Sequence, residues 1–212
     1  MRQTRVLLAD DHTILLEAFK GLLEAECEVV GTVTDGRQLI SAAVKLKPDV
    51  IVSDISMPNL NGLDACRKIK KQLPDIKLIF LTVSHDAELV AEAIRMGADG
   101  YLLKSSAASE LFQAIKSAMS GGTYITPLVT RDMIGSLTSS VDKRASLDKL
   151  TVRQREVLQL LAEGMTMKKV ASVLNVTPRT VAFHKYRMMD DLHITSNAEL
   201  IQFAVKHGLV SS

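Results

Sequence analysis

The first 120 residues alternate between short apolar runs and longer stretches in which apolar positions recur at helical spacing. The apolar runs are nearly unbroken, which is typical of parallel strands covered on both faces. Strands that alternate with helices predict a doubly wound parallel α/β sheet, whose ligand crevice lies at the carboxyl ends of the strands. We predict five strands, at about residues 6–9, 28–33, 50–52, 78–81 and 100–103, and five helices, at about residues 13–25, 36–46, 61–72, 86–96 and 107–119.

The pattern changes after residue 120. Residues 121–148 contain Gly121-Gly122, Pro127 and a cluster of Ser and Thr at 136–140, which is typical of a linker. We assign these residues to a linker with room for one short helix near 128–137. Residues 149–212 then show helical spacing only. We therefore predict two domains, 1–120 and 149–212, on either side of this linker.

The C-terminal domain has four helix starts that can be recognised from their capping residues. A Thr or Ser followed three residues later by Gln or Glu has the spacing of a capping box, and a Thr before Pro places an N-cap ahead of a proline at the first helical position. Four helices without strands predict a compact all-α domain. The start signals are Thr151 with Gln154, Thr166, Thr177 with Pro178, and Ser196 with Glu199.

Charge is distributed unevenly along the chain, although the net charge is only +2. Residues 149–212 carry 9 Lys and Arg against 5 Asp and Glu, whereas residues 1–148 carry 17 against 19. A basic C-terminal domain favours nucleic acid as a partner, and the acidic remainder favours a cation or phosphate site. No apolar run approaches the roughly 18 residues of a membrane helix, so we expect no membrane partner.

The two cysteines, Cys27 and Cys66, lie far apart on a predicted strand and a predicted helix. Buried, reduced thiols fit this placement better than a disulfide or a metal site. The few residues before the first strand are too short for a signal peptide. We expect a cytoplasmic protein.

Polar residues interrupt the apolar pattern where the strands end. Asp10-Asp11 follows the first strand, Asp54 the third, Thr82 the fourth and Lys104 the fifth. Because the carboxyl ends of parallel strands share one edge of a sheet, these residues should converge on one crevice. Clustered carboxylates repel one another, and a hard divalent cation such as Mg²⁺ removes that penalty. A hydroxyl and an ammonium beside the metal suit the attack of a carboxylate on a phosphoryl group.

These residues, together with Met57-Pro58 and Gly62, resemble the receiver domain of two-component response regulators across about residues 4–120. The resemblance implies the flavodoxin-like form of the fold and a Mg²⁺-dependent phosphorylation. By this resemblance, Asp54 is the phospho-acceptor, and the metal ligands are Asp10, Asp11, Asp54 and the backbone carbonyl of Ser56. Lys104 pairs with the phosphoryl group, and the hydroxyl of Thr82 moves to form a hydrogen bond with it. Tyr101 corresponds to the switch aromatic residue.

Four residues around the crevice stand apart from this pattern. Many receivers have a proline in a cis peptide after the lysine, where this chain has Ser105; a non-prolyl cis bond costs more, so the geometry of that loop stays open. We interpret His12 as a surface or capping residue rather than a metal ligand. Ser84 and His85 line the crevice by position, where they could tune the lifetime of the phosphoryl group.

The C-terminal domain resembles the LuxR-type helix-turn-helix of the FixJ/NarL class across nearly all of 149–210. The resemblance rests mainly on the runs 150–158, 160–164 and 177–181 and on His184. It fits a physical interpretation in which a first helix, a short turn and a second helix form the unit whose second helix enters the major groove.

Within that unit we predict a first helix at about 167–174, a turn at Asn175-Val176 and a second helix at 177–191. Val181 and Met188 should face inward. Basic and hydroxyl side chains at the start of such a helix are typical phosphate contacts. The residues expected to be available to DNA are Thr177, Arg179, Thr180, Ala182, Phe183, Lys185, Tyr186 and Arg187.

Three features depart from that family at positions that matter. Ala182 stands where a charged residue that contacts base edges is common, so that Ala182 and Phe183 offer only apolar contact, such as packing on a thymine methyl group. Asp190-Asp191 puts negative charge near the end of the helix, and Asn197 stands where arginine is frequent. These changes predict weaker or unusually specific DNA binding.

The function that follows is a phosphorylation-switched regulator of transcription, not an enzyme. A sensor histidine kinase or a small phosphodonor supplies the phosphoryl group, and the active form is a homodimer on double-stranded DNA by family resemblance. Two alternatives stay open. One is a metal-dependent phosphohydrolase, which would turn over an added phosphate ester. The other is a constitutive dimer or interaction module whose receiver is not phosphorylated.

Overall fold

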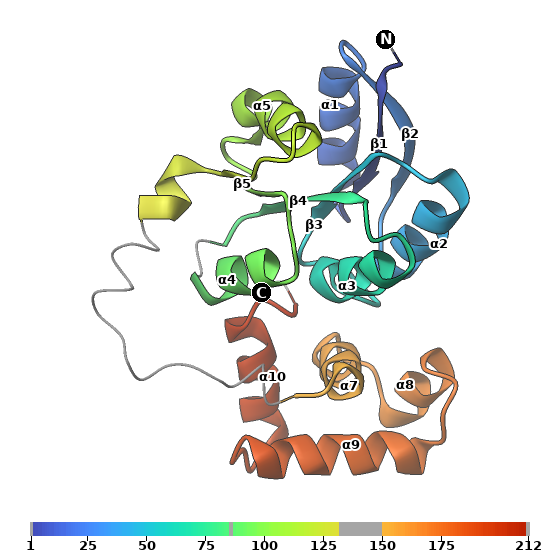
Figure 1. The fold of residues 1–212 in the computed structure, drawn as a ribbon. Coiled ribbons are helices and arrows are strands. Elements are labelled where there is room, and N and C mark those ends of the chain that lie inside the picture. The colour runs from blue at the N-terminus through green and yellow to red at the C-terminus, as the bar shows by residue number, and fades with distance from the viewer. Residues whose placement is uncertain (1, 85–86, 132–149, 211–212) are drawn as a thin grey trace. The chain divides into compact units, whose positions relative to one another are not determined.

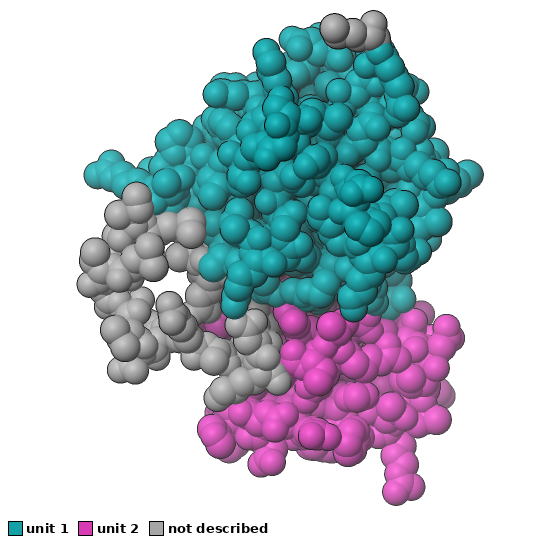
Figure 2. Space-filling model, viewed as in Figure 1, with its two compact units in different colours: residues 1–140 teal, residues 141–212 magenta. Residues whose placement is uncertain are grey.

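The computed structural model describes residues 2–84, 87–131 and 150–210. The chain divides into two compact units, residues 1–140 and residues 141–212 (Figure 2). The first unit contains the sheet with its helices, and the second contains helices only among its described residues.

The sheet of the first unit has six parallel strands in the order β2-β1-β3-β4-β5-β6 (Figure 1). All five predicted strands are present, and the near-continuous burial of the central ones explains their unbroken apolar sequences. The strands are β1 (Thr4–Ala9), β2 (Cys27–Val33), β3 (Val50–Asp54), β4 (Lys77–Thr82), β5 (Gly100–Leu103) and β6 (Tyr124–Ile125).

Five helices cover the two faces of this sheet, as the helical spacing predicted. α1 and α5 pack on one face over a core that includes Phe19 and Leu111, while α2, α3 and α4 pack on the other over a core that includes Leu39 and Phe80 (Figure 1). The doubly wound arrangement is therefore confirmed. The helices are α1 (Thr13–Leu23), α2 (Gly36–Leu46), α3 (Gly62–Gln72), α4 (Ala87–Arg95) and α5 (Ala107–Met119).

The sixth strand, β6, was not predicted and lies in the stretch assigned to the linker. It pairs Tyr124 with Gly100 and Ile125 with Tyr101 at the edge of the sheet. Residues 127–131 are helical, and Val129 is fully buried against the core of the first unit. A strand of two residues leaves no periodic pattern, which is why hydrophobic spacing did not show it. The rest of the predicted linker, from residue 132, lies outside the described residues.

The second unit is a bundle of short helices around one core. The helices are α7 (Val152–Ala162), α8 (Met167–Val173), α9 (Pro178–Asp191) and α10 (Asn197–Lys206). All four predicted caps form: each side-chain oxygen accepts from the backbone N–H three residues later, and Thr151 and Gln154 complete a capping box. Val157, Val181, Met188 and Leu200 are among the residues of the core.

Neither cysteine forms a disulfide, and both are buried, as predicted. Burial raises the pKa of the Cys66 thiol to about 12, so the group stays protonated at neutral pH.

Among the described residues, no helix is both long enough and apolar enough to cross a bilayer.

Candidate functional site

The register of the sheet brings the polar strand ends together. Ala9 pairs with Ser53, so that Asp10 and Asp54 follow at the ends of adjacent strands. Thr82 pairs with Leu103, and Lys104 follows Leu103 directly. Nζ of Lys104 is 2.8 Å from Oδ2 of Asp54 and 2.7 Å from Oδ2 of Asp10. Asp10, Asp54 and Lys104 lie far apart in the sequence but form one charged cluster, as the pattern of strand ends predicted.

Burial decides the electrostatics of this cluster. Asp54 is only 4% exposed and Asp10 1%. Loss of solvent raises the pKa of the Asp54 carboxyl to about 6, although Lys104 acts in the opposite direction, the charge of Asp10 adds to the rise, and the backbone N–H of Ser56 lowers it. Burial by itself would lower the pKa of Lys104, but the two carboxylates outweigh it and raise that pKa. The lysine is the internal counter-charge of the cluster.

The loop after Asp54 is held by a close approach between β3 and α3. A Cβ at Gly62 would lie 1.9 Å from the carbonyl oxygen of Asp54, which only glycine avoids. The N–H of Gly62 donates to the carbonyl of Ile55 at 2.7 Å, and the side chain of Asn61 caps α3. The N–H of Ser56 donates to Oδ1 of Asp54 at 3.2 Å, which orients the carboxylate.

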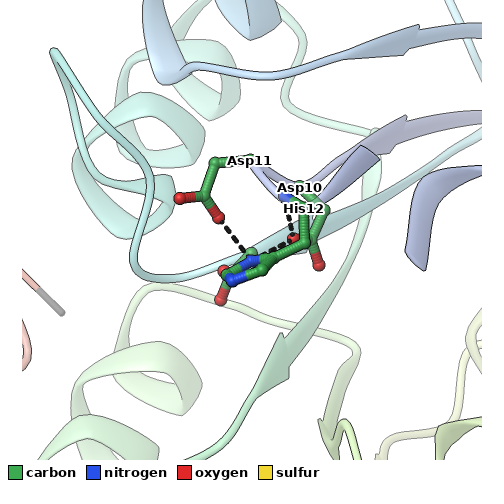
Figure 3. Close-up of side chains that lie close together, drawn as sticks. Asp10, Asp11 and His12 are labelled. Atoms are coloured by element: carbon green, nitrogen blue, oxygen red, sulfur yellow. Dashed lines mark hydrogen bonds and ion pairs between the residues drawn. The ribbon is translucent and has the colours of Figure 1, made fainter. Parts of the chain in front are cut away.

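His12 lies closer to the acidic pair than the sequence indicated. Its ring Nδ1 is 2.9 Å from Oδ1 of Asp11 and 3.2 Å from Oδ1 of Asp10 (Figure 3). His12 is also the N-cap residue of α1, so the predicted capping position is correct, although its side chain makes no cap hydrogen bond. The pattern gave no signal for the contact with the carboxylates, because it depends on the direction of the side chain.

The donor set fits a hard divalent cation. Ligand atoms of Asp10, Asp11, His12 and Asp54 all lie within 4.8 Å of one another. Three of these residues are carboxylates, which supply oxygen ligands of the type that Mg²⁺ prefers. Asp10 and Asp11 follow β1, and Asp54 ends β3. These residues could hold such an ion.

The hydroxyl and aromatic side chains predicted for the switch lie on adjacent strands. Thr82 is 3% exposed, and its Oγ1 accepts from the N–H of Ser84 at 3.0 Å. Tyr101 is fully buried, and its hydroxyl donates to the carbonyl of Ser84 at 3.3 Å. The two residues are thus joined through the segment that follows β4. His85 lies outside the described residues.

The segment around Lys104 is fixed from both sides. The N–H of Lys104 donates to the carbonyl of Thr82 at 2.7 Å, and the N–H of Leu103 donates to Oγ1 of Thr126 at 3.2 Å. The hydroxyl of Thr126 in turn donates to Glu110 at 2.7 Å. The peptide between Lys104 and Ser105 is trans, as are all described peptides. The sequence pattern gives no signal for Thr126, because this residue follows β6, a strand of only two residues.

The second unit presents the predicted helix-turn-helix. α8 is followed by Asn175 with a left-handed backbone (φ 52°), and Thr177 with Pro178 begins α9. Val181 and Met188 are fully buried, as predicted. Along α9 and its N-cap, the exposed residues are Thr177, Arg179, Phe183, Tyr186 and Arg187, while Thr180 and Ala182 are half-buried.

Lys185 lies differently from these residues. Its side chain is buried, at 9% exposure, on the inward side of α9 with Val181 and Met188. At 3.6 residues per turn, position 185 follows Val181 by about one turn, so it shares the inward stripe. Its ammonium lies 5.2 Å from the centre of the Tyr186 ring. The expectation that Lys185 is available to DNA does not fit this placement.

The acidic residues at the end of α9 have different surroundings. Asp191 accepts from the side-chain amide of Gln154 at 3.3 Å, which ties α9 to the capping box of α7. Asp190 is exposed, and Asn197 is exposed at the first position of α10. Of the negative charges that we expected to weaken DNA binding, Asp191 therefore has a structural partner.

Comparison with known proteins agrees with both halves of the chain. Residues 6–116 match the family described as the response regulator receiver domain, and residues 148–204 match bacterial regulatory proteins of the luxR family. The oxygen regulatory protein NreC of Staphylococcus carnosus is 33% identical over 97% of this chain and 99% of its own length. The response regulator UvrY of Escherichia coli K12 is 32% identical over 98% of this chain and 96% of its own length.

Solved structures of response regulators are similar to nearly the whole chain. The RcsB response regulator of Salmonella typhimurium is similar over 97% of this chain and 98% of its own, with 26% identity and a TM-score of 0.69. A structure of two RcsB dimers bound to two parallel DNAs is similar over 95% of this chain and 98% of its own, with 26% identity and a TM-score of 0.61. The chain therefore belongs to the response regulators that combine a receiver domain with a LuxR-family DNA-binding domain.

Proposed function

We propose that Asp54 accepts a phosphoryl group and that this modification controls DNA binding by α9, and hence transcription. The observation that carries the proposal is the position of the Lys104 ammonium, within 2.8 Å of both Asp54 and Asp10 at one buried edge of the sheet. A buried acid beside an ammonium and a second acidic pair is a strongly perturbed site, of the kind found where chemistry takes place. A relative described as a response regulator, UvrY, supports the same role.

In the proposed reaction, one oxygen of the Asp54 carboxylate attacks the phosphorus atom of the donor. A bond forms between that oxygen and phosphorus, the bond from phosphorus to the leaving group breaks, and the product is an acyl phosphate. In a sensor histidine kinase the leaving group is the imidazole nitrogen, and in acetyl phosphate it is acetate. Lys104 offsets the negative charge that gathers on the phosphoryl oxygens. The N–H of Ser56 holds the carboxylate in place.

Asp10, Asp11 and Asp54, with the backbone carbonyl of Ser56, would hold Mg²⁺ in this site. When bound, the cation neutralises the phosphoryl oxygens and the clustered carboxylates.

The protein acts as a regulator rather than as an enzyme with a diffusible substrate. We propose that slow hydrolysis of the acyl phosphate, at the same edge, returns it to its starting state.

The signal would leave the site through Thr82 and Tyr101. Thr82 is buried beside the cluster, and a phosphoryl group on Asp54 offers its hydroxyl a charged acceptor. Thr82 and Tyr101 both bond to Ser84. If Thr82 gives up its bond to the N–H of Ser84, the segment after β4 loses one of its restraints. Phosphorylation then favours one arrangement of this face over another.

The output would be a homodimer on double-stranded DNA. The exposed Arg179 and Arg187 of α9 supply positive charge, and the helix is the second of a helix-turn-helix. Two half-sites increase affinity because the second contact is effectively intramolecular. The free, buried thiols of Cys27 and Cys66 fit action in the cytoplasm.

The test is an intact-mass measurement after incubation with Mg²⁺ and acetyl phosphate. Wild type should gain the mass of one phosphate, and Asp54→Asn should gain none. Thr82→Ala should still be labelled, because its hydroxyl acts after transfer. No labelling of wild type, or equal labelling of Asp54→Asn, would show that Asp54 is not the acceptor.

A further inference from the structure

Two large aromatic side chains lie in water on α9, where most aromatic residues would be buried. Phe183 is 57% exposed and Tyr186 is 60% exposed. Exposed apolar side chains that gather on one face usually mark a binding surface. We propose that Phe183 is the residue by which this protein recognises sequence, through contact of its ring with the 5-methyl group of thymine in the major groove. The proposal rests on the proposed function and deepens its DNA-binding half.

The position of Phe183 on the helix supports this role. Val181 and Met188 mark the buried side of α9. At 3.6 residues per turn, the opposite side is occupied by Arg179, Phe183 and Tyr186, spaced by four and three residues. Phe183 is therefore the central member of the outward stripe. In a helix-turn-helix, base contacts come from the N-terminal part of that stripe, and Phe183 lies in the second turn of α9.

The ring is also held in place. The guanidinium carbon of Arg187 lies 5.9 Å from the centre of the Phe183 ring, and the ring of His184 packs edge-on against it at 5.6 Å. A cation over the face of an aromatic ring is attracted by it. A ring restrained before binding loses less conformational freedom when DNA is bound.

The charge of this face identifies DNA, rather than another protein, as its occupant. Arg187 is exposed beside the ring, Arg179 is exposed one turn earlier on α9, and both suit phosphate oxygens. Between them, Ala182 and Phe183 offer no donor or acceptor to a base edge. In the major groove, adenine, guanine and cytosine present only donors and acceptors, and thymine alone adds a methyl group. An apolar contact flanked by two cations thus matches a thymine between phosphates.

The two kinds of contact respond differently to salt. Contacts to phosphate release counterions, so each one steepens the dependence of affinity on salt concentration. Contact with a methyl group releases none. Loss of Phe183 should therefore weaken binding without a change in the salt slope, whereas loss of Arg179 or Arg187 should reduce the slope.

The experiment uses the full chain after treatment with acetyl phosphate and Mg²⁺. Preferred duplexes are selected from a random library, and each thymine of the preferred duplex is then replaced by deoxyuridine, which lacks only the methyl group. Affinities are measured by fluorescence anisotropy. Wild type should bind about fourfold more weakly when the contacted thymine is replaced, the factor expected for one buried methyl group. Phe183→Ala should bind the two duplexes equally, and Phe183→Leu should retain part of the difference.

Arg179→Ala is the matched control, because Arg179 is exposed on the same stripe, whereas the ring of Phe183 contacts Arg187 and His184. It should lose affinity for both duplexes by the same factor, with a shallower salt slope. The inference is overturned if no thymine in the preferred duplex is sensitive to deoxyuridine, or if Phe183→Ala is as sensitive as wild type. It is also overturned if Phe183→Ala changes the oligomeric state, measured as molar mass by light scattering, and lowers the affinity for both duplexes by the same factor. Failure to enrich any duplex would instead contradict the proposed function, so the two failures are distinguishable.

Discussion

The two candidate sites hold their functional side chains in opposite ways. At the edge of the sheet, Asp10, Asp54 and Thr82 are almost fully buried, and their positions follow from the pairing of strands. On α9, Arg179, Phe183 and Arg187 project into water from one helix. Burial makes the first site electrostatically strong before any ligand binds, whereas the second gains its strength only when a partner excludes water. Substitutions in the first should therefore change folding and chemistry together, and those in the second should change binding alone.

The largest effect should follow removal of the Lys104 ammonium. Lys104→Met leaves two buried carboxylates without their common counter-charge, which costs about 3 kcal/mol of unfolding free energy at neutral pH in the presence of EDTA. Urea unfolding followed by circular dichroism measures it. Mg²⁺ should restore part of the loss, because the cation takes over the neutralisation.

Lys77→Met is the control, because Nζ of Lys77 is 2.9 Å from Asp99 in a pair that is partly exposed to solvent. It should cost less than about 1 kcal/mol. Equal costs for Lys104→Met and Lys77→Met would mean that burial does not strengthen the cluster at the sheet edge.

The next effect has the opposite sign. The pKa of Asp54 is raised by burial to about 6 in the folded protein, against about 4 in an unfolded chain. Between these values the native state binds a proton that the unfolded state has lost, so stability falls as pH rises from about 4 to about 6. Asp54→Asn should remove this loss and stabilise the metal-free protein by about 2 kcal/mol at pH 7.

Unfolding by urea at pH 4, 5, 6 and 7, with EDTA present, measures that effect. The gain from Asp54→Asn should be near zero at pH 4 and should grow until about pH 6. A gain that is independent of pH would assign it to packing rather than to ionisation of the buried carboxyl.

A smaller effect is expected on α9. Arg187→Ala should weaken binding of the preferred duplex about tenfold at low salt and reduce the slope of log affinity against log salt by about 1. The thermal unfolding of the second unit should stay unchanged, because Arg187 is exposed. A loss of stability comparable to the loss of affinity would remove the distinction between the two sites.

The smallest effect is expected for Lys185→Met. The buried stem of Lys185 is matched in length by methionine, and its ammonium lies over Tyr186 rather than in open solvent. DNA affinity should change by less than about twofold, which is the size of one weak surface interaction. A salt slope reduced as much as in Arg187→Ala would return Lys185 to the phosphate contacts.

The same contrast explains how much could be predicted from sequence. The parallel strands place their ends on one edge, so Asp10, Asp54, Thr82 and Lys104 could be brought together from pattern alone, and the structure confirms that they are. The pattern could not show that the ring of His12 turns toward Asp11, because side-chain direction is set by local rotamers. Nor could it show β6 or the bond from Leu103 to Thr126, which depend on a strand of two residues.

On α9 the limit was different. The inward stripe of Val181 and Met188 was predicted correctly, but Lys185 was assigned by its charge rather than by its angle on the helix. The helical period places it next to that stripe, and its long aliphatic stem allows burial. Residue type is therefore a weaker guide than position wherever the side chain is amphipathic.

Gly62 shows what the buried site demands of residues that touch no ligand. Its missing side chain lets α3 begin directly behind the carbonyl of Asp54, where even one methyl group would overlap an oxygen atom at 1.9 Å. A saturation-mutagenesis screen scored by transcription would therefore rank position 62 beside position 54, although one fails through misfolding and the other through lost chemistry. Measuring the amount of soluble protein alongside the reporter signal separates scaffold positions from reactive ones in such data.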